Sequence, residues 1–148
     1  MYFHFFFGQT DCGYVLQANT AFYKSFTDKN FDEMKKVWMQ SESVQFIHPS
    51  HEPLVRYKNV MASWKGMFDS DVKNFQMNSM VPYSIRLSVK GCTALLTCNE
   101  EVYTAKFVRG VGKTKELIKK MMATNIFWKQ DDGHATAELH ICELHICA

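Results

Sequence analysis

The sequence carries little excess charge of either sign, because 17 Lys and Arg residues stand against 15 Asp and Glu residues. The formal net charge of +2 is too small to indicate a nucleic-acid partner. No CxxC pair is present, so neither a zinc ribbon nor a disulfide framework is indicated. We expect a reducing, cytoplasmic location and no cofactor. The cysteines are Cys12, Cys92, Cys98, Cys142 and Cys147.

A long apolar run is also missing near the start. The opening residues, MYFHFFFG, are aromatic, but they lack a basic segment and a small-residue cleavage site, and they are too short to span a bilayer. We therefore expect no signal peptide and no membrane association. Residues 1–13 are interpreted as an N-terminal extension packed on the domain or on a partner subunit. Residues 14–148 are interpreted as a single domain, whose 47% hydrophobic content can fill a core and line a cavity.

Apolar side chains recur at helical spacing in the first half of the chain. They predict a helix from Tyr14 to Phe26 and another from Tyr57 to Phe68. Between them, Asn30 with Glu33 three residues later is typical of a helix N-terminus. The residues expected to pack inward from these helices are Val15, Ala18, Phe22, Phe26, Phe31, Met34, Trp38, Val60, Trp64, Met67 and Phe68.

Strands are expected in the second half. Residues 75–80 predict a strand with Pro82 at its edge or in a turn, and residues 84–90 alternate strictly between apolar and polar. An apolar run from Cys92 to Cys98 continues toward Tyr103. Residues 123–129 predict a further strand, 131–133 a hairpin turn, and the remainder a final strand. Helices followed by antiparallel strands indicate an α+β fold, in which a curved sheet around the helices leaves a pocket between them.

Residues Arg109 to Lys120 are interpreted as a basic excursion between two strands. Leu117 and Ile118 are expected to anchor a short helical turn there while the lysines stay solvated. The stretch Gly110 to Thr114 resembles the last residues of a phosphate-binding loop, whose pattern is GxxxxGK[ST]. That loop needs glycine where this chain has Phe107, and a parallel βα context that is not predicted here. We therefore reject a phosphate-binding loop.

The most informative segment runs from Val44 to Phe68 and reads VQFIHPSHEPLVRYKNVMASWKGMF. An apolar strand stops at His-Pro, a loop follows, and a helix carries a tryptophan. This order resembles the SnoaL-like (polyketide-cyclase-like) branch of the nuclear transport factor 2-like superfamily. NTAFYKSFTDKNFDEMKKVW at residues 19–38 resembles that family's opening helices, and ATNIFWKQDDG at residues 123–133 resembles its penultimate strand and turn. The resemblance covers roughly residues 14–133.

The resemblance implies a cone-shaped α+β fold, in which a curved mixed or antiparallel sheet wraps around three N-terminal helices, as in cystatin-like proteins. Two departures stand out. The chain has Arg56-Tyr57 where the family has glycine, and its last strand has only isolated His140 and His145 where the family has a run of histidines. No role of that histidine run is therefore carried over to this chain.

The last residues repeat LHIC, which places soft metal ligands close together in the sequence. Along a strand, His140 and Cys142 share one face, whereas His145 and Cys147 lie on the other. The four could converge only around a turn or bulge. We therefore expect an apolar terminal strand and no metal site.

His48 is the residue best suited to catalysis or ligand binding, because an imidazole at the end of an apolar strand could act as a general base or orient a ligand carbonyl. The alternative is a histidine bonded to backbone that fixes the following loop. Trp64 is expected in the core or in a pocket wall. Thr124, Asn125 and either Glu100 or Glu101 are candidate polar groups. The residues expected to bind a ligand are Phe22, Trp38, Phe46, His48, Trp64, Glu100 and Asn125.

Two functions stay open at this stage. In the first, the domain binds a small hydrophobic ligand, or binds and transforms it, using His48 with one carboxylate. An enzyme of this kind would be a general acid–base isomerase, cyclase or dehydratase without a cofactor. The isomerase branch of the superfamily uses a carboxylic acid and a tyrosine in an apolar cavity, and no motif places such a pair here. In the second, the domain is a non-catalytic dimerisation or protein-interaction module. In either case we expect a homodimer through the sheet face.

Overall fold

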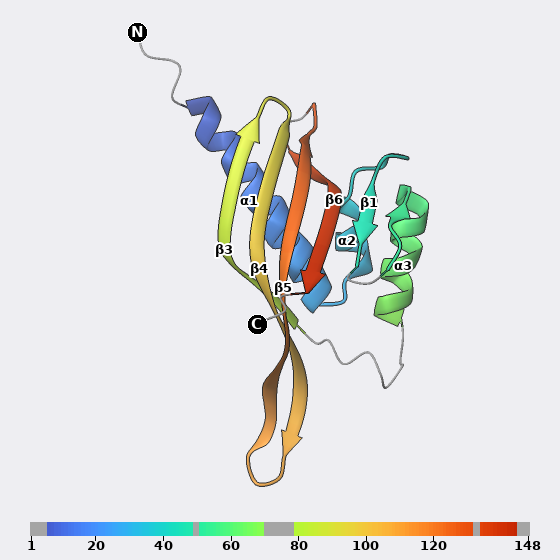
Figure 1. Cartoon of the computed structure of the whole chain (residues 1–148), viewed down its shortest axis with the longest axis vertical. Helices are drawn as coiled ribbons and strands as arrows, with labels where there is room; N and C mark the ends of the chain where they lie inside the picture. The colour runs from blue at the N-terminus through green and yellow to red at the C-terminus, as the bar shows by residue number, and fades with distance from the viewer. Residues whose placement is uncertain (1–5, 49–50, 70–78, 132–133, 145–148) are drawn as a thin grey trace.

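The computed structural model describes residues 6–48, 51–69, 79–131 and 134–144. Helices dominate the first half of the chain and strands the second (Figure 1). The helices are α1 (Phe6–Thr27), α2 (Phe31–Val37) and α3 (Tyr57–Asp69), and the strands are β1 (Gln45–Ile47), β2 (Leu54–Val55), β3 (Ser79–Lys90), β4 (Thr93–Val108), β5 (Gly112–Lys129) and β6 (Ala135–Leu144). The α+β fold expected from the sequence is confirmed. Among the described helices, none has the length and apolar character needed to cross a membrane.

One mixed sheet contains these strands in the order β2-β1-β6-β5-β4-β3. Neighbouring strands are antiparallel except β1 and β6, which run parallel. Helix α1 crosses behind the sheet, and β4 and β5 continue past the body of the domain as a long hairpin (Figure 1). We call the sheet face covered by the helices the inner face, because alternate residues of β4 on that side are buried.

Helix α2 begins as the sequence predicts. Asn30 has extended backbone geometry, and its side-chain oxygen accepts a hydrogen bond from the backbone N–H of Glu33 at 3.1 Å. This bond satisfies one of the donors left unpaired at a helix N-terminus. The Glu33 carboxylate instead binds Lys36 at 2.6 Å, so the capping is one-sided.

Helix α1 begins at Phe6 rather than at Tyr14, so residues 6–13, interpreted as an extension, continue the helix. The first residues of the strand expected over 75–80 lie outside the described part. From Ser79, β3 runs without interruption through Pro82, which an edge strand tolerates because its N–H need not pair. The register shifts between Tyr83 and Arg86, with Ser84 at a positive φ of 53°, which is typical of a β-bulge.

The helical turn expected within Arg109 to Lys120 is wrong. These residues form the tip of the β4–β5 hairpin and the first half of β5, with Lys115 opposite Ala105 and Lys113 opposite Phe107. The long partner strand β4 pairs with most of this stretch, with one register shift between Val102 and Tyr103, and so satisfies more backbone groups than an isolated helical turn can. In the turn expected over 131–133, only Asp131 belongs to the described residues.

Candidate functional site

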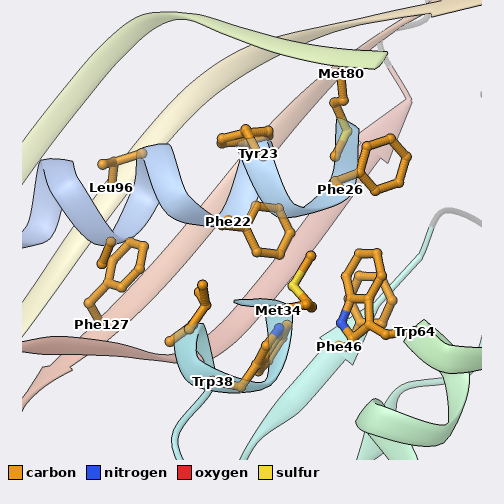
Figure 2. Close-up of a cluster of buried hydrophobic side chains, with 14 of the residues drawn as sticks. Phe22, Tyr23, Phe26, Met34, Trp38, Phe46, Trp64, Met80, Leu96 and Phe127 are labelled. Atoms are coloured by element: carbon orange, nitrogen blue, oxygen red, sulfur yellow. The ribbon is translucent and has the colours of Figure 1, made fainter. Parts of the chain in front are cut away.

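Aromatic rings fill the space between the helices and the inner face of the sheet (Figure 2). Phe22 comes from α1, Trp38 follows α2, Phe46 comes from β1 and Trp64 from α3. The ring centroids of Phe46 and Trp64 stack 4.6 Å apart, and Phe22 meets Trp64 edge-on at 5.7 Å. All four side chains are almost fully buried. The structure therefore brings together the aromatic residues that the sequence suggested as pocket walls.

Three polar side chains point into this aromatic interior from adjacent strands. Glu100 on β4, Asn125 on β5 and His140 on β6 are each at most 2% exposed. Asn125 and His140 are direct partners in the β5–β6 ladder, so their side chains lie side by side on the same face. The His140 ring is packed between Phe22, at 4.6 Å, and Phe46, at 5.5 Å.

Helix α1 supplies two further polar groups to the same interior. Asn19 and Tyr23 are four residues apart and so share a helix face. The Tyr23 hydroxyl donates to Glu100 Oε1 at 2.6 Å and lies 3.2 Å from Cys98 Sγ. Asn125 Nδ2 donates to Asn19 Oδ1 at 2.9 Å.

The Asn125 amide fixes the orientation of the neighbouring imidazole. With its Nδ2 donating to Asn19, Asn125 presents Oδ1 to His140 Nδ1, and this contact assigns the His140 proton to Nδ1. The opposite ring nitrogen, Nε2, then faces Glu100 Oε1 at 3.9 Å. This separation exceeds a direct hydrogen bond. A carboxyl group, a phenol and an imidazole thus converge in one apolar interior.

Burial dominates the electrostatics of this cluster. It lowers the pKa of His140 to about 3, with a contribution from His48, so the imidazole is neutral near pH 7. Burial, followed by the Glu100 carboxylate and Cys98, raises the pKa of Tyr23, so its hydroxyl keeps the proton that it donates. Burial also raises the pKa of the Cys98 thiol to about 11, against the opposing Tyr23 hydrogen bond.

His48 lies beside this cluster and is half-buried. Its ring contacts Phe46 at 4.0 Å and lies 6.0 Å from His51. Burial, then His51 and Lys119, lowers the pKa of His48 to about 4. The histidine that the structure places against the Glu100 carboxylate is His140 rather than His48. A catalytic role for His48 stays a prediction.

The structure separates the two carboxylate candidates on β4. Glu100 faces the interior, whereas Glu101 faces the opposite side of the sheet, where it accepts from Tyr103 at 2.5 Å and pairs with Lys120 at 3.4 Å. Thr124 shares that outer side and is only half-buried. The described residues contain no group of three metal-ligating side chains, and His145 and Cys147 of the LHIC repeat lie outside them.

Sequence reasoning missed Tyr23, Asn19, Cys98 and His140 as members of the cluster. A signal for two of them was present in the sequence. The spacing of Asn19 and Tyr23 matches the buried helical stripe, displaced by one residue from Ala18 and Phe22. The position of His140 depends on the β5–β6 register, which shifts between Ile126 and Phe127, and no local pattern reveals that shift.

Three solved structures from bacteria share this architecture. A proposed dehydratase of the NTF2-like family from Streptomyces avermitilis superposes with a TM-score of 0.76 at 22% identity, covering 94% of this chain and 99% of that one. A proposed association domain of calcium/calmodulin-dependent protein kinase type II from Thiobacillus denitrificans gives 0.69 at 22% identity, covering 86% and 91%. An NTF2-like protein with a cystatin-like fold from Novosphingobium aromaticivorans gives 0.73 at 13% identity, covering 93% and 84%.

These likenesses show the fold, and at such identities they show no activity for this chain. No curated protein matches the sequence. The SnoaL-like domain matches residues 15–142, which covers nearly all of the roughly 14–133 over which the sequence shows the resemblance and includes the whole polar cluster. The chain belongs to the SnoaL-like domain family.

Proposed function

We propose that this protein binds a small, flat, mostly apolar molecule inside the cone and moves a proton on it with its own side chains. The observation that supports this proposal is the Glu100 carboxyl group, 0% exposed, with the Tyr23 hydroxyl at 2.6 Å and His140 Nε2 at 3.9 Å. Titratable groups that converge in an apolar interior are typical of general acid–base sites.

Each polar group has a distinct role in this proposal. Glu100 takes a proton from a carbon next to a ligand carbonyl and later returns it. The C–H electron pair forms a double bond to the carbonyl carbon, and the C=O π pair moves onto the oxygen, which becomes an oxyanion. Tyr23 retains its proton and can donate a hydrogen bond to that oxyanion. His140 stays neutral and is held by Asn125, so it orients the ligand without adding a buried charge.

Two indole N–H groups give this interior additional binding capacity. Trp38 Nε1 and Trp64 Nε1 are buried without a hydrogen-bond partner in the described structure. Leaving such a donor unsatisfied costs roughly 1–3 kcal/mol. A ligand acceptor would remove that penalty. Because the rings are in contact, a ligand must first separate them, and the neighbouring Met34 is suited to this because methionine changes rotamer easily (Figure 2).

Proton transfer can be tested without knowing the natural substrate. The wild-type protein is incubated in D₂O with a bicyclic aromatic ketone such as 2-tetralone, and deuterium incorporation next to the carbonyl is followed by NMR. We expect Glu100→Gln to lower the rate above background by about 10²-fold or more. The matched control is Glu101→Gln, the same change on the outer face of the same strand. No exchange by the wild type, or equal rates in both variants, would contradict the proposal.

Binding has its own readout. The three tryptophans give three indole N–H signals in a ¹H–¹⁵N spectrum. A bound ligand should shift the signals of Trp38 and Trp64, which lie in the interior, and leave Trp128, 41% exposed on the outer side, nearly unchanged. Shifts confined to Trp128 would place the ligand outside the cone and contradict binding at this site.

The outer face of the sheet supports a second proposal, that two copies associate through it. Leu95 and Met122 are 44% and 42% exposed on that face. Ile126 lies opposite Leu95, and Tyr83 lies opposite Asn99, which is itself paired with Met122. An apolar patch of this kind on a soluble domain marks an interaction surface. Such an interface is compatible with both a ligand-binding protein and a non-catalytic dimerisation module.

Sedimentation tests the interface. We expect a dimer at micromolar concentration, and a monomer of 17.2 kDa after the double change Leu95→Glu and Met122→Glu. The control is Phe107→Glu with Val111→Glu, which puts the same two charges at exposed positions of the hairpin tip. A wild-type protein that sediments only as a monomer would contradict the proposal.

We also propose that the protein works in a reducing compartment such as the cytoplasm, since Cys98 is a free thiol hydrogen-bonded to Tyr23.

A further inference from the structure

A hollow lies outside the aromatic interior, where the β4–β5 hairpin leaves the body of the domain. It encloses about 450 Å³, a volume typical of small-molecule sites. The end of α1, the first residue of β3 and both strands of the hairpin contribute to it. We call it the hairpin groove, and its lining residues are Thr27, Lys29, Ser79, Tyr103, Thr104, Ala105, Lys113, Thr114 and Lys115.

The charged side chains that line the hairpin groove in the described structure are all basic. The groove has three ammonium groups, from Lys29, Lys113 and Lys115, and no carboxylate among the described residues that line it. Lys113 and Lys115 are two residues apart on β5, so the strand projects them from the same face. Within the described part of the chain, none of these lysines takes part in an ion pair. The groove therefore concentrates positive charge in a chain that is nearly neutral overall.

The acidic groups nearest in sequence are already neutralised. Glu116 pairs with Lys106 at 3.2 Å, and Glu101 pairs with Lys120 at 3.4 Å. Asp28, next to Lys29, is paired with Lys24. These pairs leave the lysines of the groove available to an external anion.

Hydroxyl groups make up most of the remaining lining, and one of them is unsatisfied. Ser79 is 5% exposed, and its Oγ is buried without a hydrogen-bond partner. The neighbouring Thr27 hydroxyl accepts a bond from the backbone N–H of Met80 at 3.5 Å, which ties the start of β3 to the end of α1. Native structures seldom leave a buried hydroxyl unpaired, and a ligand oxygen at this point would pair it.

We propose that the hairpin groove binds the phosphate group of a small phosphate monoester. A phosphate monoester carries about −1.5 to −2 charges near pH 7 and three acceptor oxygens, which matches several ammonium groups and a serine hydroxyl better than one carboxylate does. This way of binding phosphate differs from the phosphate-binding loop rejected above, because Lys113 and Thr114 lie in strand β5 and not before a helix. The site is also independent of the acid–base cluster.

Calorimetric titration of the full chain tests this inference. The probes are inorganic phosphate, glycerol 3-phosphate and glucose 6-phosphate, with potassium acetate as the carboxylate comparison. Vesicles of phosphatidic acid, compared with phosphatidylcholine, distinguish a lipid headgroup from a free monoester as the source of the phosphate. We expect at least one phosphate probe to bind, acetate to bind about tenfold more weakly or not at all, and added salt to weaken binding.

Variants assign the binding to the groove. The double change Lys113→Gln and Lys115→Gln should weaken binding about tenfold or more, because charge-assisted hydrogen bonds are lost. The matched control, Lys58→Gln with Lys90→Gln, removes the same charge from exposed sites on α3 and β3 outside the groove. No binding of any phosphate probe, or an equal loss in both double variants, would overturn the proposal.

Ser79→Ala separates ligand binding from a structural role. This change removes a hydroxyl that makes no hydrogen bond in the protein, so the thermal midpoint without ligand should not fall. Phosphate affinity should nevertheless drop about fivefold, the effect of one hydrogen bond. Unchanged phosphate affinity in this variant would remove Ser79 from the site and overturn the proposed geometry.

Discussion

Trp64 offers the sharpest test of how the interior is held together. Its side chain is 1% exposed and stacks on Phe46 at 4.6 Å, with Phe22, Phe26 and Phe68 around it at 5.7–6.1 Å. Removing a buried tryptophan side chain leaves a cavity and costs about 3–5 kcal/mol of unfolding free energy. Native domains have about 5–15 kcal/mol in total, so Trp64→Ala should bring this protein close to unfolding.

A second substitution at the same position separates cavity from hydrogen bonding. Trp64→Phe keeps a ring against Phe46 and removes Nε1, a buried donor without a partner. Removing this unsatisfied donor is favourable, which offsets part of the cost of the smaller cavity. We therefore expect a loss of only about 1–2 kcal/mol of unfolding free energy. The control is Phe107→Ala, which deletes a ring that is 80% exposed and should change stability by less than about 0.5 kcal/mol.

Urea unfolding followed by far-UV circular dichroism measures these differences, since a change in midpoint at constant slope reports stability alone. A cost below about 1 kcal/mol for Trp64→Ala would show that the surrounding rings collapse into the space, against the packing argument. Both variants lack the indole N–H, so equal costs for Trp64→Ala and Trp64→Phe would show that a phenyl ring at this position adds no packing energy.

Substitutions at three further positions have defined outcomes. Asn30→Ala removes the N-cap of α2 and should cost about 1 kcal/mol in the same urea assay, whereas Asn30→Asp should cost little. Tyr23→Phe deprives the buried Glu100 of its hydroxyl donor and should cost about 1–3 kcal/mol, and a neutral result would mean that the bond contributes nothing. For His48, the folded pKa of about 4 lies below the ordinary 6.5, so the unfolded chain binds more protons and stability should fall as the pH drops from 6.5 to 4. His48→Gln should make that fall shallower, and an unchanged slope would contradict the lowered pKa.

Local patterns accounted for most of the fold. The His-Pro stop after Phe46 and Ile47 marked the end of β1, and the aromatic spacing around Trp64 marked α3. The hairpin arm was misjudged, because KTKELIKK carries no clear period of two, and its strand character depends on pairing with distant residues of β4. The early start of α1 was missed because the aromatic run before Gly8 has no helical stripe.

Only part of the candidate site could be identified from the sequence, because the rest depends on contacts between residues that are distant in the chain. Glu100 and Asn125 were identifiable because each lies on an alternating apolar strand. Their partners were not, since Tyr23 is 77 residues from Glu100 and Asn19 is 106 residues from Asn125 along the chain. Contacts of that separation are set by how α1 packs on the sheet, and a single sequence does not state that packing.

The energetic cost of the polar cluster favours a ligand-binding interior over a purely structural one. Burying Glu100 and His140 opposes folding, and apolar residues of similar size usually stabilise a core equally well or better. Two indole donors are left unsatisfied in the same interior, which adds to that cost. If the cluster were only structural, replacing Glu100 with Met together with Tyr23→Phe, which removes both partners of their hydrogen bond, should lower stability. If the cluster exists to act on a ligand, the double variant should be as stable as the wild type or more stable, and should lose proton exchange on 2-tetralone.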